Sequence, residues 1–287
     1  MEKTDIAKNN SFNIRGNINI ADTVVLIRGA GEQASGIAHC LFRAGFKICL
    51  TEIAKPLAVR RGVSFCEAIY EGEKDVEGAK ARLAKNREEI DLIWGKKEIP
   101  VFVDPQNQIK NFLRPLVVID ATLAKINQGT SITDAPLVIG MGPGFTAGMD
   151  VHIVVETQRG PNLGRLIIDG EAEPNTGVPQ PVHGFGRERV LRSPCDGAFN
   201  STRNIGETVS AGDIVAEVAG ESVSALIPGT VRGLIRNGTY VTKNLKVGDI
   251  DPRGNYLSCF TISDKARALG GAALEAILWK LPSYMVQ

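Results

Sequence analysis

The sequence predicts an α/β fold: a Rossmann-like parallel-sheet domain, then a small all-β barrel-sandwich module, then a C-terminal helix. Three observations predict it. Apolar strand-like runs alternate with helical or loop segments up to residue 155. An internal repeat of short strands and turns occupies residues 190–251, and a helical pattern follows residue 263. The expected division is a polar tail (1–20), the sheet domain (21–170), a Gly- and Pro-rich linker or lid (171–189), the β module (190–262) and the helix (263–287).

Composition excludes several classes of protein. The chain has 287 residues, of which 43% are hydrophobic and 23% charged, as is typical of soluble globular proteins. It contains no apolar run of membrane-spanning length, and its first residues lack the apolar segment of a signal peptide, so we expect a cytoplasmic protein without membrane contact. A net charge of +1 gives no reason to expect nucleic acid. Five cysteines without a CxxC pair predict neither disulfides nor a metal site.

Residues 24–52 read as one complete β–turn–α–β unit. A β-branched run leads directly into a glycine turn and a helix, and a second strand ends on Glu52, 23 residues after Gly29. Glycines in such a turn let the backbone approach a ligand phosphate, and a carboxylate after the second strand can hold a ribose hydroxyl. We therefore expect Gly29, Gly31, Gln33 and Glu52 to bind a cofactor. The alternative is that the turn serves tight packing alone.

The segment that follows, residues 56–94, carries an arginine pair and a helical pattern. The adjacent Arg60 and Arg61 could grip a phosphate or carboxylate, although a solvated basic turn is the alternative. An amphipathic helix with a charged outer face is predicted over residues 74–94.

Further binding residues are predicted at the ends of later strands. Asp120 and Thr122 follow an apolar strand, and ligands of parallel sheets bind beyond the carboxyl ends of the strands. An equal alternative is that Asp120 only caps the next segment. Gly142 and Gly144 belong to a glycine-rich loop that we expect to be a second binding element. Four strands are predicted in this part of the chain, over residues 100–104, 116–120, 137–140 and 151–155.

The last of these strands and the segment after it contain further polar residues. His152 lies inside an apolar strand, which favours a hydrogen-bonded core histidine over a catalyst. An edge strand is possible over residues 165–169. The following lid carries polar side chains that could close over a ligand, namely those of Glu173, Asn175, Thr176 and His183.

The internal repeat pairs Gly197 with Gly229 and Gly206 with Gly238 at an offset of 32 residues. The pattern SPCDGAF, GETVSAGDIVAEV, ALIPGTVRGLI resembles the biotinyl/lipoyl barrel-sandwich family, whose members carry their prosthetic group on a hairpin lysine. No lysine occurs between residues 204 and 242, so we expect no covalent biotin or lipoate. Cys195 lies in a turn of this module, where a small turn residue is favoured over a reactive thiol.

The C-terminal part is predicted as a strand over residues 256–262 and a helix begun by Ser263 as N-cap. Gly270 and Gly271 each cost such a helix roughly 1 kcal/mol relative to alanine, so a close-packed neighbour should compensate. We expect the apolar face of this helix to return to the sheet domain or to meet a second subunit. That face consists of Ala266, Leu269, Ala273 and Ile277.

Five stretches carry a wider resemblance: VLIRGAGEQASGIAHCLFRAGF, AVRRGVSFCEAIYEG, GMGPGFTAGMDVHIVVETQRGPNLGR, EPNTGVPQPVHGFGRERVLRSP and CFTISDKARALGGAALEAI. They resemble the YqeB family, whose members are proposed accessory proteins of selenium-dependent molybdenum hydroxylases. The resemblance implies a maturation role toward a xanthine-dehydrogenase-like client, with the molybdenum cofactor as molybdopterin or its dinucleotide form. The resemblance implies no catalytic residues for this sequence.

Two functional classes follow, and whether the protein is an enzyme stays open. In the first, the crevice binds the molybdenum cofactor for delivery or modification. In the second, the protein is an NAD-dependent oxidoreductase in which Glu52 selects NAD over its phosphorylated relative. The second needs an acid–base pair in the crevice, and the sequence places none there clearly, so the first is favoured. A homo-oligomer is compatible with both.

Overall fold

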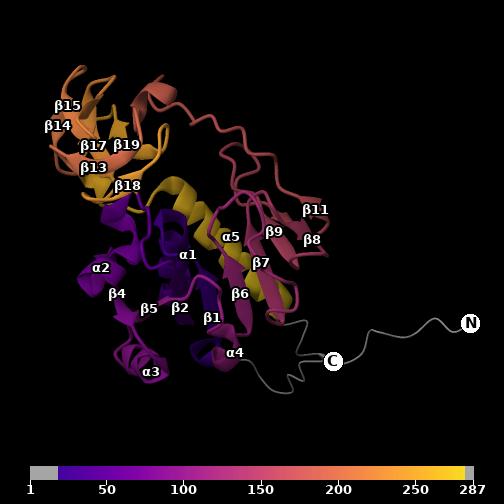
Figure 1. Ribbon diagram of the computed structural model, residues 1–287. Coiled ribbons are helices and arrows are strands. Elements are labelled where there is room, and N and C mark those ends of the chain that lie inside the picture. The colour runs from indigo at the N-terminus through magenta and orange to yellow at the C-terminus, as the bar shows by residue number, and fades with distance from the viewer. Residues whose placement is uncertain (1–18, 282–287) are drawn as a thin grey trace, which may run out of the picture.

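One nine-stranded sheet forms the centre of the protein, of which the computed structural model describes residues 19–281 (Figure 1). Its inner strands are parallel, and an antiparallel strand closes each edge. Across the sheet the strands are β10 (Leu166–Ile167), β9 (Ile153–Val155), β7 (Leu137–Met141), β6 (Val117–Asp120), β1 (Val24–Arg28), β2 (Lys47–Glu52), β5 (Ile99–Val103), β4 (Ala79–Ala84) and β3 (Glu73–Val76).

The predicted fold class is therefore wrong. A Rossmann-like parallel-sheet domain followed by a barrel-sandwich was expected, whereas the large sheet is mixed and several antiparallel sheets accompany it. The smallest pairs β8 (Thr146–Ala147) with β11 (Gly170–Glu171). Residues 190–251 form two four-stranded antiparallel sheets, in the orders β12-β19-β17-β14 and β16-β15-β13-β18. Their strands are β12 (Val190–Arg192), β13 (Gly197–Ser201), β14 (Thr208–Val209), β15 (Ile214–Val218), β16 (Glu221–Ser224), β17 (Gly229–Leu234), β18 (Tyr240–Val241) and β19 (Lys246–Asp251).

The helix predicted over residues 74–94 is also wrong. A hairpin, β3 and β4, occupies residues 73–84, and only the end of the segment is helical, as α3 (Arg87–Gly95). Val76 pairs with Ala79, so the loop is only Glu77 and Gly78, and both have positive φ. This backbone is that of a type I′ turn, which matches the twist of two antiparallel strands. The hairpin supplies the antiparallel edge that the predicted sheet lacked.

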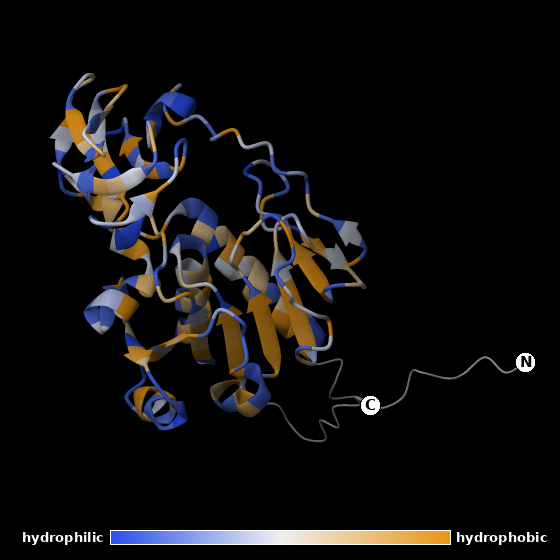
Figure 2. Ribbon diagram, in the orientation of Figure 1, coloured by the Kyte–Doolittle hydropathy of each residue, from blue (hydrophilic) through white to orange (hydrophobic). Residues whose placement is uncertain are grey.

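Helices cover both faces of the large sheet. The core on one face lies under α1 (Glu32–Arg43) and α5 (Asp264–Lys280), and that on the other lies under α3 and α4 (Lys110–Leu113). Alternate residues of β1 serve the two cores: Val25 and Ile27 join the first, and Leu26 joins the second. Because they are buried on both faces, the central strands are mainly apolar, with polar residues such as Arg28, Glu52 and Asp120 at their carboxyl ends (Figure 2). The predicted strands over 100–104, 116–120, 137–140 and 151–155 correspond to β5, β6, β7 and β9.

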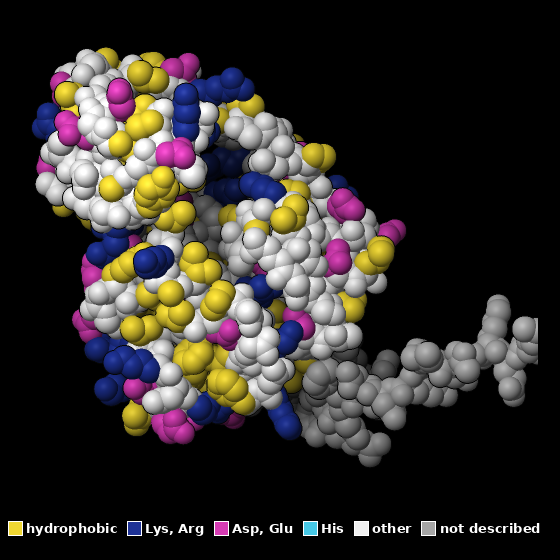
Figure 3. Space-filling model, viewed as in Figure 1, with side chains coloured by type: hydrophobic (Ala, Val, Ile, Leu, Met, Phe, Trp, Pro, Cys, Tyr) yellow, Lys and Arg dark blue, Asp and Glu magenta, His cyan; other side chains and the backbone are white. Residues whose placement is uncertain are grey.

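The antiparallel part, residues 190–251, sits at one end of the large sheet and has its own core (Figure 1). The linker of residues 171–189 runs between the two parts along the outside. Figure 3 shows a hollow between them, with Lys and Arg side chains in its depth. The strand predicted over 256–262 is instead a short 3₁₀ helix, η5 (Tyr256–Cys259), because Asn255 caps it by accepting a hydrogen bond from Leu257 N.

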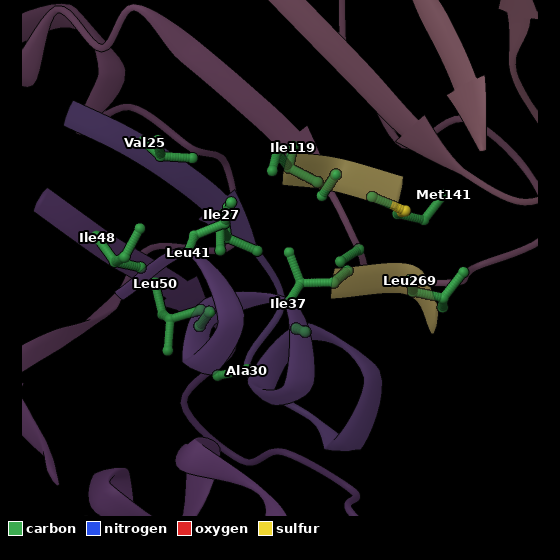
Figure 4. Packing of buried hydrophobic residues seen from close by; sticks show 14 of the residues in the cluster. Val25, Ile27, Ala30, Ile37, Leu41, Ile48, Leu50, Ile119, Met141 and Leu269 are labelled. Atoms are coloured by element: carbon green, nitrogen blue, oxygen red, sulfur yellow. The ribbon is translucent and has the colours of Figure 1, made fainter. Parts of the chain in front are cut away.

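Helix α5 returns to the large sheet and packs against α1. This is the first of the two expected arrangements, the other being contact with a second subunit. Figure 4 shows Ile37 and Leu41 of α1 and Leu269 of α5 among the buried residues of the core that α1 and α5 cover. A Cβ atom on Gly36 would lie 2.6 Å from that of Ala266, and one on Gly270 would lie 2.7 Å from that of Cys40. The close-packed neighbour predicted for Gly270 is therefore α1. Nothing lies within 4 Å of a Cβ on Gly271.

The two adjacent glycines of α5 should respond oppositely to alanine. Gly271→Ala gains helix propensity in open space and should raise the free energy of unfolding by about 1 kcal/mol. Gly270→Ala forces α1 and α5 apart, and an overpacking cost of about 1–3 kcal/mol should exceed the same gain. Urea unfolding monitored by circular dichroism measures both. Equal stabilisation by the two substitutions would contradict the close approach of the helices.

Candidate functional site

A pocket of about 400 Å³ lies where β1, β2 and β6 end. We call it the strand-end pocket. In the sheet, β1 lies between β2 and β6, so the chain proceeds from β1 toward one edge of the sheet and later toward the other. Open α/β sheets bind ligands at the strand ends where the direction changes in this way. The pocket brings together five of the eight residues predicted from the sequence, namely Gly29, Gly31, Gln33, Glu52 and Thr122.

The two glycines of the turn have different tasks. Gly29 has φ +93°, and a Cβ there would lie 3.0 Å from the carbonyl oxygen of Ala121, so this glycine serves the packing of the turn. Gly31 has ordinary backbone angles and nothing within 4 Å of its Cβ position. It is the N-cap of α1, and no side chain caps the helix. The first N–H groups of α1 are therefore open to an anion in the pocket.

Glu52 holds the turn in place. Its Oε2 accepts a hydrogen bond from Ala30 N at 2.9 Å, and its Oε1 accepts one from Ile53 N at 2.8 Å. Burial raises the pKa of Glu52, and these two backbone hydrogen bonds only partly offset the rise. A carboxylate has about four acceptor positions, so each oxygen can take a further donor. Glu52 can therefore brace the turn and still bind a ligand hydroxyl or amine.

Gln33 contributes an unsatisfied acceptor to the same wall. Its Oε1 is buried and has no hydrogen-bond partner among the described residues. Buried acceptors of this kind are usually satisfied, so a donor from a ligand or from water would complete this one. Thr122 is exposed, and its hydroxyl donates to Asp120 Oδ1 at 2.7 Å, which leaves the Thr122 oxygen able to accept.

Asp120 lies behind the pocket wall and is fully buried. It accepts hydrogen bonds from Arg28 at 2.9 Å, from the Thr130 hydroxyl at 2.6 Å and from Thr122 N at 3.1 Å. These bonds fit the alternative role, in which Asp120 holds the segment that follows it. Its carboxylate is committed to these partners and braces the loop after β6.

Gly142 and Gly144 also lie outside the strand-end pocket. Their φ angles are +83° and +106°. A Cβ would lie 2.5 Å from the Thr157 hydroxyl at Gly142 and 2.9 Å from the Ile126 backbone at Gly144. The structure thus gives both glycines a packing task in which two loops meet closely.

Arg60 and Arg61 connect the two parts of the molecule. Arg60 pairs with Glu32 at 3.0 Å and donates to the carbonyls of Ser258 and Thr261. Arg61 donates from Nε to the carbonyl of Leu234 at 2.7 Å. The first arginine thereby ties the start of α1 to the segment that follows the antiparallel part.

The other polar residues singled out in the sequence lie away from the pocket. His152 accepts a hydrogen bond from Val138 N at its Nδ1, and burial lowers its pKa, in keeping with a core histidine. Glu173 accepts from Gln158 and Asn162, while Asn175, Thr176 and His183 are exposed along the linker. Cys195 is half-buried, and its thiol donates to the carbonyl of Val218.

Sequence reasoning missed several residues of the pocket wall. Ile53 and Leu57 follow β2, and Leu123 and Gln128 follow β6. Their position just after strands of a parallel sheet is a signal that could have found them. Cys66 lines the same pocket, and burial, with the nearby Glu52 and Glu67 charges, raises its pKa well above the ordinary value. Its thiol therefore stays protonated and is a poor nucleophile.

Two further features are absent from residues 19–281. This part of the chain has no group of three or more His, Cys, Asp or Glu side chains arranged to hold a metal ion. It also has no helix long and apolar enough to cross a membrane.

Comparison with curated proteins finds YqeB of Escherichia coli (strain K12), an uncharacterized protein, at 46% identity over 255 residues. The match covers 89% of this chain and 47% of that protein, so the chain spans about half the length of this relative. Identity at this level over most of the chain supports the resemblance to the YqeB family. No family model matches the sequence.

Solved structures give only weak likenesses. An aspartoacylase family protein from Mesorhizobium loti shares 16% identity with a TM-score of 0.25, covering 80% of this chain and 85% of that one. TcdA (CsdL) shares 15% identity with a TM-score of 0.30, covering 91% and 88% of the two chains. The ectoine utilization protein EutE (DoeB) from Ruegeria pomeroyi shares 11% with a TM-score of 0.26, covering 81% and 86%.

The role of Asp120 can be tested through stability. Asp120→Ala leaves the guanidinium of Arg28, which is only 5% exposed, buried without its carboxylate. Breaking a buried pair in this way should lower the free energy of unfolding by about 3–5 kcal/mol. The control is Asp22→Ala, which breaks an exposed pair with Lys47 and should cost less than about 1 kcal/mol. Denaturant unfolding of both variants is the measurement. If Asp120→Ala costs no more than Asp22→Ala, the bracing role of Asp120 is contradicted and the predicted role in ligand binding is favoured.

Proposed function

We propose that this relative of YqeB binds the molybdenum cofactor, as molybdopterin or its dinucleotide form, in the strand-end pocket and delivers or modifies it during maturation of a selenium-dependent molybdenum hydroxylase. The observation that carries the proposal is the uncapped start of α1 facing a pocket beside Glu52. The identity to YqeB supports the family resemblance from which the maturation role comes.

The residues present fit a phosphate-bearing cofactor. A phosphate would accept from the first N–H groups of α1, at the positive end of the helix dipole, and Gly31 leaves it room. Glu52 and the unpartnered Gln33 Oε1 would accept from ring or ribose donors. The volume of about 400 Å³ lies within the range of small-molecule sites.

The chemistry of the wall favours binding over turnover. Its titratable side chains are Glu32, Glu52 and Cys66. Glu32 is paired with Arg60, Glu52 holds the turn, and the Cys66 thiol is protonated, so they form no nucleophile–base pair. The molybdenum cofactor supplies redox chemistry to the enzyme that finally holds it, and a carrier must release it intact. The antiparallel part would dock the xanthine-dehydrogenase-like client, whereas the linker of residues 171–189 contributes no residue to the pocket wall and is not proposed as its gate.

A direct assay separates this function from its rival. Purified protein is incubated with molybdenum cofactor and, separately, with oxidised and reduced nicotinamide dinucleotides. A carrier should retain the molybdenum cofactor and restore activity to an inactive molybdenum hydroxylase. Steady hydride transfer to a small carbonyl or imine substrate, without cofactor retention, would instead establish an NAD-dependent oxidoreductase.

Two substitutions locate the site. Gly31→Leu has allowed backbone angles and no neighbour to strike, so the variant should fold, but its side chain should fill the phosphate position and abolish binding. Glu52→Ala removes a charged acceptor and should weaken binding by roughly 1.5–3 kcal/mol, about tenfold or more. Equilibrium binding of the molybdenum cofactor measures both effects.

The matched control is Gly95→Leu, because Gly95 also has open space around its Cβ position and lies at the end of α3, outside the pocket wall. It should bind as the parent does. If Gly31→Leu and Glu52→Ala fold and bind as tightly as this control, the cofactor site lies elsewhere.

A further inference from the structure

A second pocket, of about 330 Å³, lies where the antiparallel part meets the large-sheet part. We call it the seam pocket. Its wall holds three arginines, Arg61, Arg203 and Arg236, together with a serine, a threonine and two asparagines, and no carboxylate. It shares no wall residue with the strand-end pocket. We infer that the seam pocket binds a small molecule that carries a phosphate or diphosphate group, at a site additional to the proposed cofactor site.

Arg203 supplies donors that the protein leaves unused. Its terminal nitrogens lie 3.8 Å from Glu207 and 3.9 Å from Asp213, beyond hydrogen-bond distance. The side chain is 39% exposed, so it can turn toward the pocket at little cost. A phosphate in the pocket would offer it shorter, charge-assisted bonds than either carboxylate does.

The other two arginines are held more firmly. Arg61 uses its Nε on the carbonyl of Leu234, and its Nη1 lies 3.6 Å from Glu67, so its terminal nitrogens remain able to donate. Arg236 donates one terminal nitrogen to Glu67 and Glu71, and it stacks over the Tyr70 ring at 4.4 Å. Its Nε is buried and has no partner among the described residues. These contacts preorganise two guanidinium groups before a ligand arrives.

One further wall residue, Asn237, suits the same ligand, whereas Ser201, Thr202 and Asn204 already donate to other groups of the protein. Asn237 accepts from Ser201 N through its Oδ1, which directs its amide N–H groups elsewhere for donation. Inorganic phosphate alone would leave much of this volume empty, so the ligand has a further polar part. The wall presents guanidinium groups, while the carboxylates that neighbour them, Glu67, Glu71, Glu207 and Asp213, lie outside it, so an anion in the pocket would meet donors and no acceptor carboxylate of the wall.

A bound phosphate would bridge two parts of the fold. Arg61 belongs to the short 3₁₀ helix η2 (Arg61–Val63) after β2, whereas Arg203 and Arg236 follow β13 and β17 of the antiparallel part. A ligand held by all three would stabilise their contact, because it binds only when the parts are together. Binding should therefore raise the temperature of unfolding.

The test titrates inorganic phosphate and pyrophosphate into the full chain by calorimetry at low ionic strength. The titration uses the Gly31→Leu background, so that binding at the start of α1 does not contribute. One molecule of pyrophosphate should bind per chain, more tightly than phosphate. Arg203→Gln should weaken it about tenfold, the loss expected of a hydrogen bond between charged groups. Glu207→Gln removes a competing carboxylate and should tighten binding, and at equal concentration pyrophosphate should raise the melting temperature of Arg203→Gln less than that of the other variants.

The control is Arg43→Gln at an exposed arginine of α1 outside both pockets, and it should bind as the background does. Circular dichroism verifies that each variant is folded. The inference is overturned if pyrophosphate does not bind at millimolar concentration, or if Arg203→Gln binds as tightly as Arg43→Gln. Failure here leaves the cofactor assay untouched, since that assay reads the strand-end pocket.

Discussion

The close approach of α1 and α5 is the constraint on which the rest of the structure depends. Gly36 and Gly270 allow it, because any side chain at either position would enter the opposite helix. The contact places α1 along the core of β1 and β2, so its first turn opens at the ends of those strands. The same contact fixes the start of α5, directly after the segment that leads from the antiparallel part. The packing of α1 against α5 thus fixes the positions of the first turn of α1, which lines the strand-end pocket, and of the start of α5.

The seam between the two parts is built from equally close contacts. A Cβ on Gly62 would lie 2.7 Å from the carbonyl oxygen of Cys259, and one on Gly233 would lie 2.5 Å from that of Val59. Arg60 adds a polar link, since it binds Glu32 in the first turn of α1 and two carbonyls beyond the antiparallel part. A shift of the antiparallel part would therefore pull on the side chain next to Gly31. This coupling links the position of the antiparallel part to the first turn of α1 beside the pocket.

The sequence predicts the local elements better than their assembly. The unit of β1, α1 and β2 and the later apolar strands follow from short-range patterns that survive in the fold. The hairpin of residues 73–84 was missed because Val76, Ala79 and Leu83 also fit a helical period, and the two-residue turn at Glu77 and Gly78 decides between them. The fold class failed for a related reason, since edge strands and sheet partners depend on distant segments.

The candidate site divides in the same way. Gly29, Gly31, Gln33, Glu52 and Thr122 share one pocket because ends of neighbouring parallel strands must meet. No such rule reveals that Asp120 already has Arg28 and Thr130 as partners. Likewise, Arg61, Arg203 and Arg236 are far apart in the chain, and only the fold brings them to one wall.

Glu52 joins stability to binding at the strand-end pocket. Its raised pKa means that the folded protein disfavours the ionised carboxylate. Below the unfolded-state pKa the carboxyl is protonated in both states and does not lower the free energy of unfolding. As pH rises from there through the folded-state pKa, the free energy of unfolding falls. The hydrogen bonds from Ala30 and Ile53 reduce this cost without removing it. A ligand that donates to the carboxylate stabilises the ionised form and relieves what remains. The ionised carboxylate of Glu52 is therefore least favourable when the pocket holds no donor, and a donor bound there would raise the free energy of unfolding.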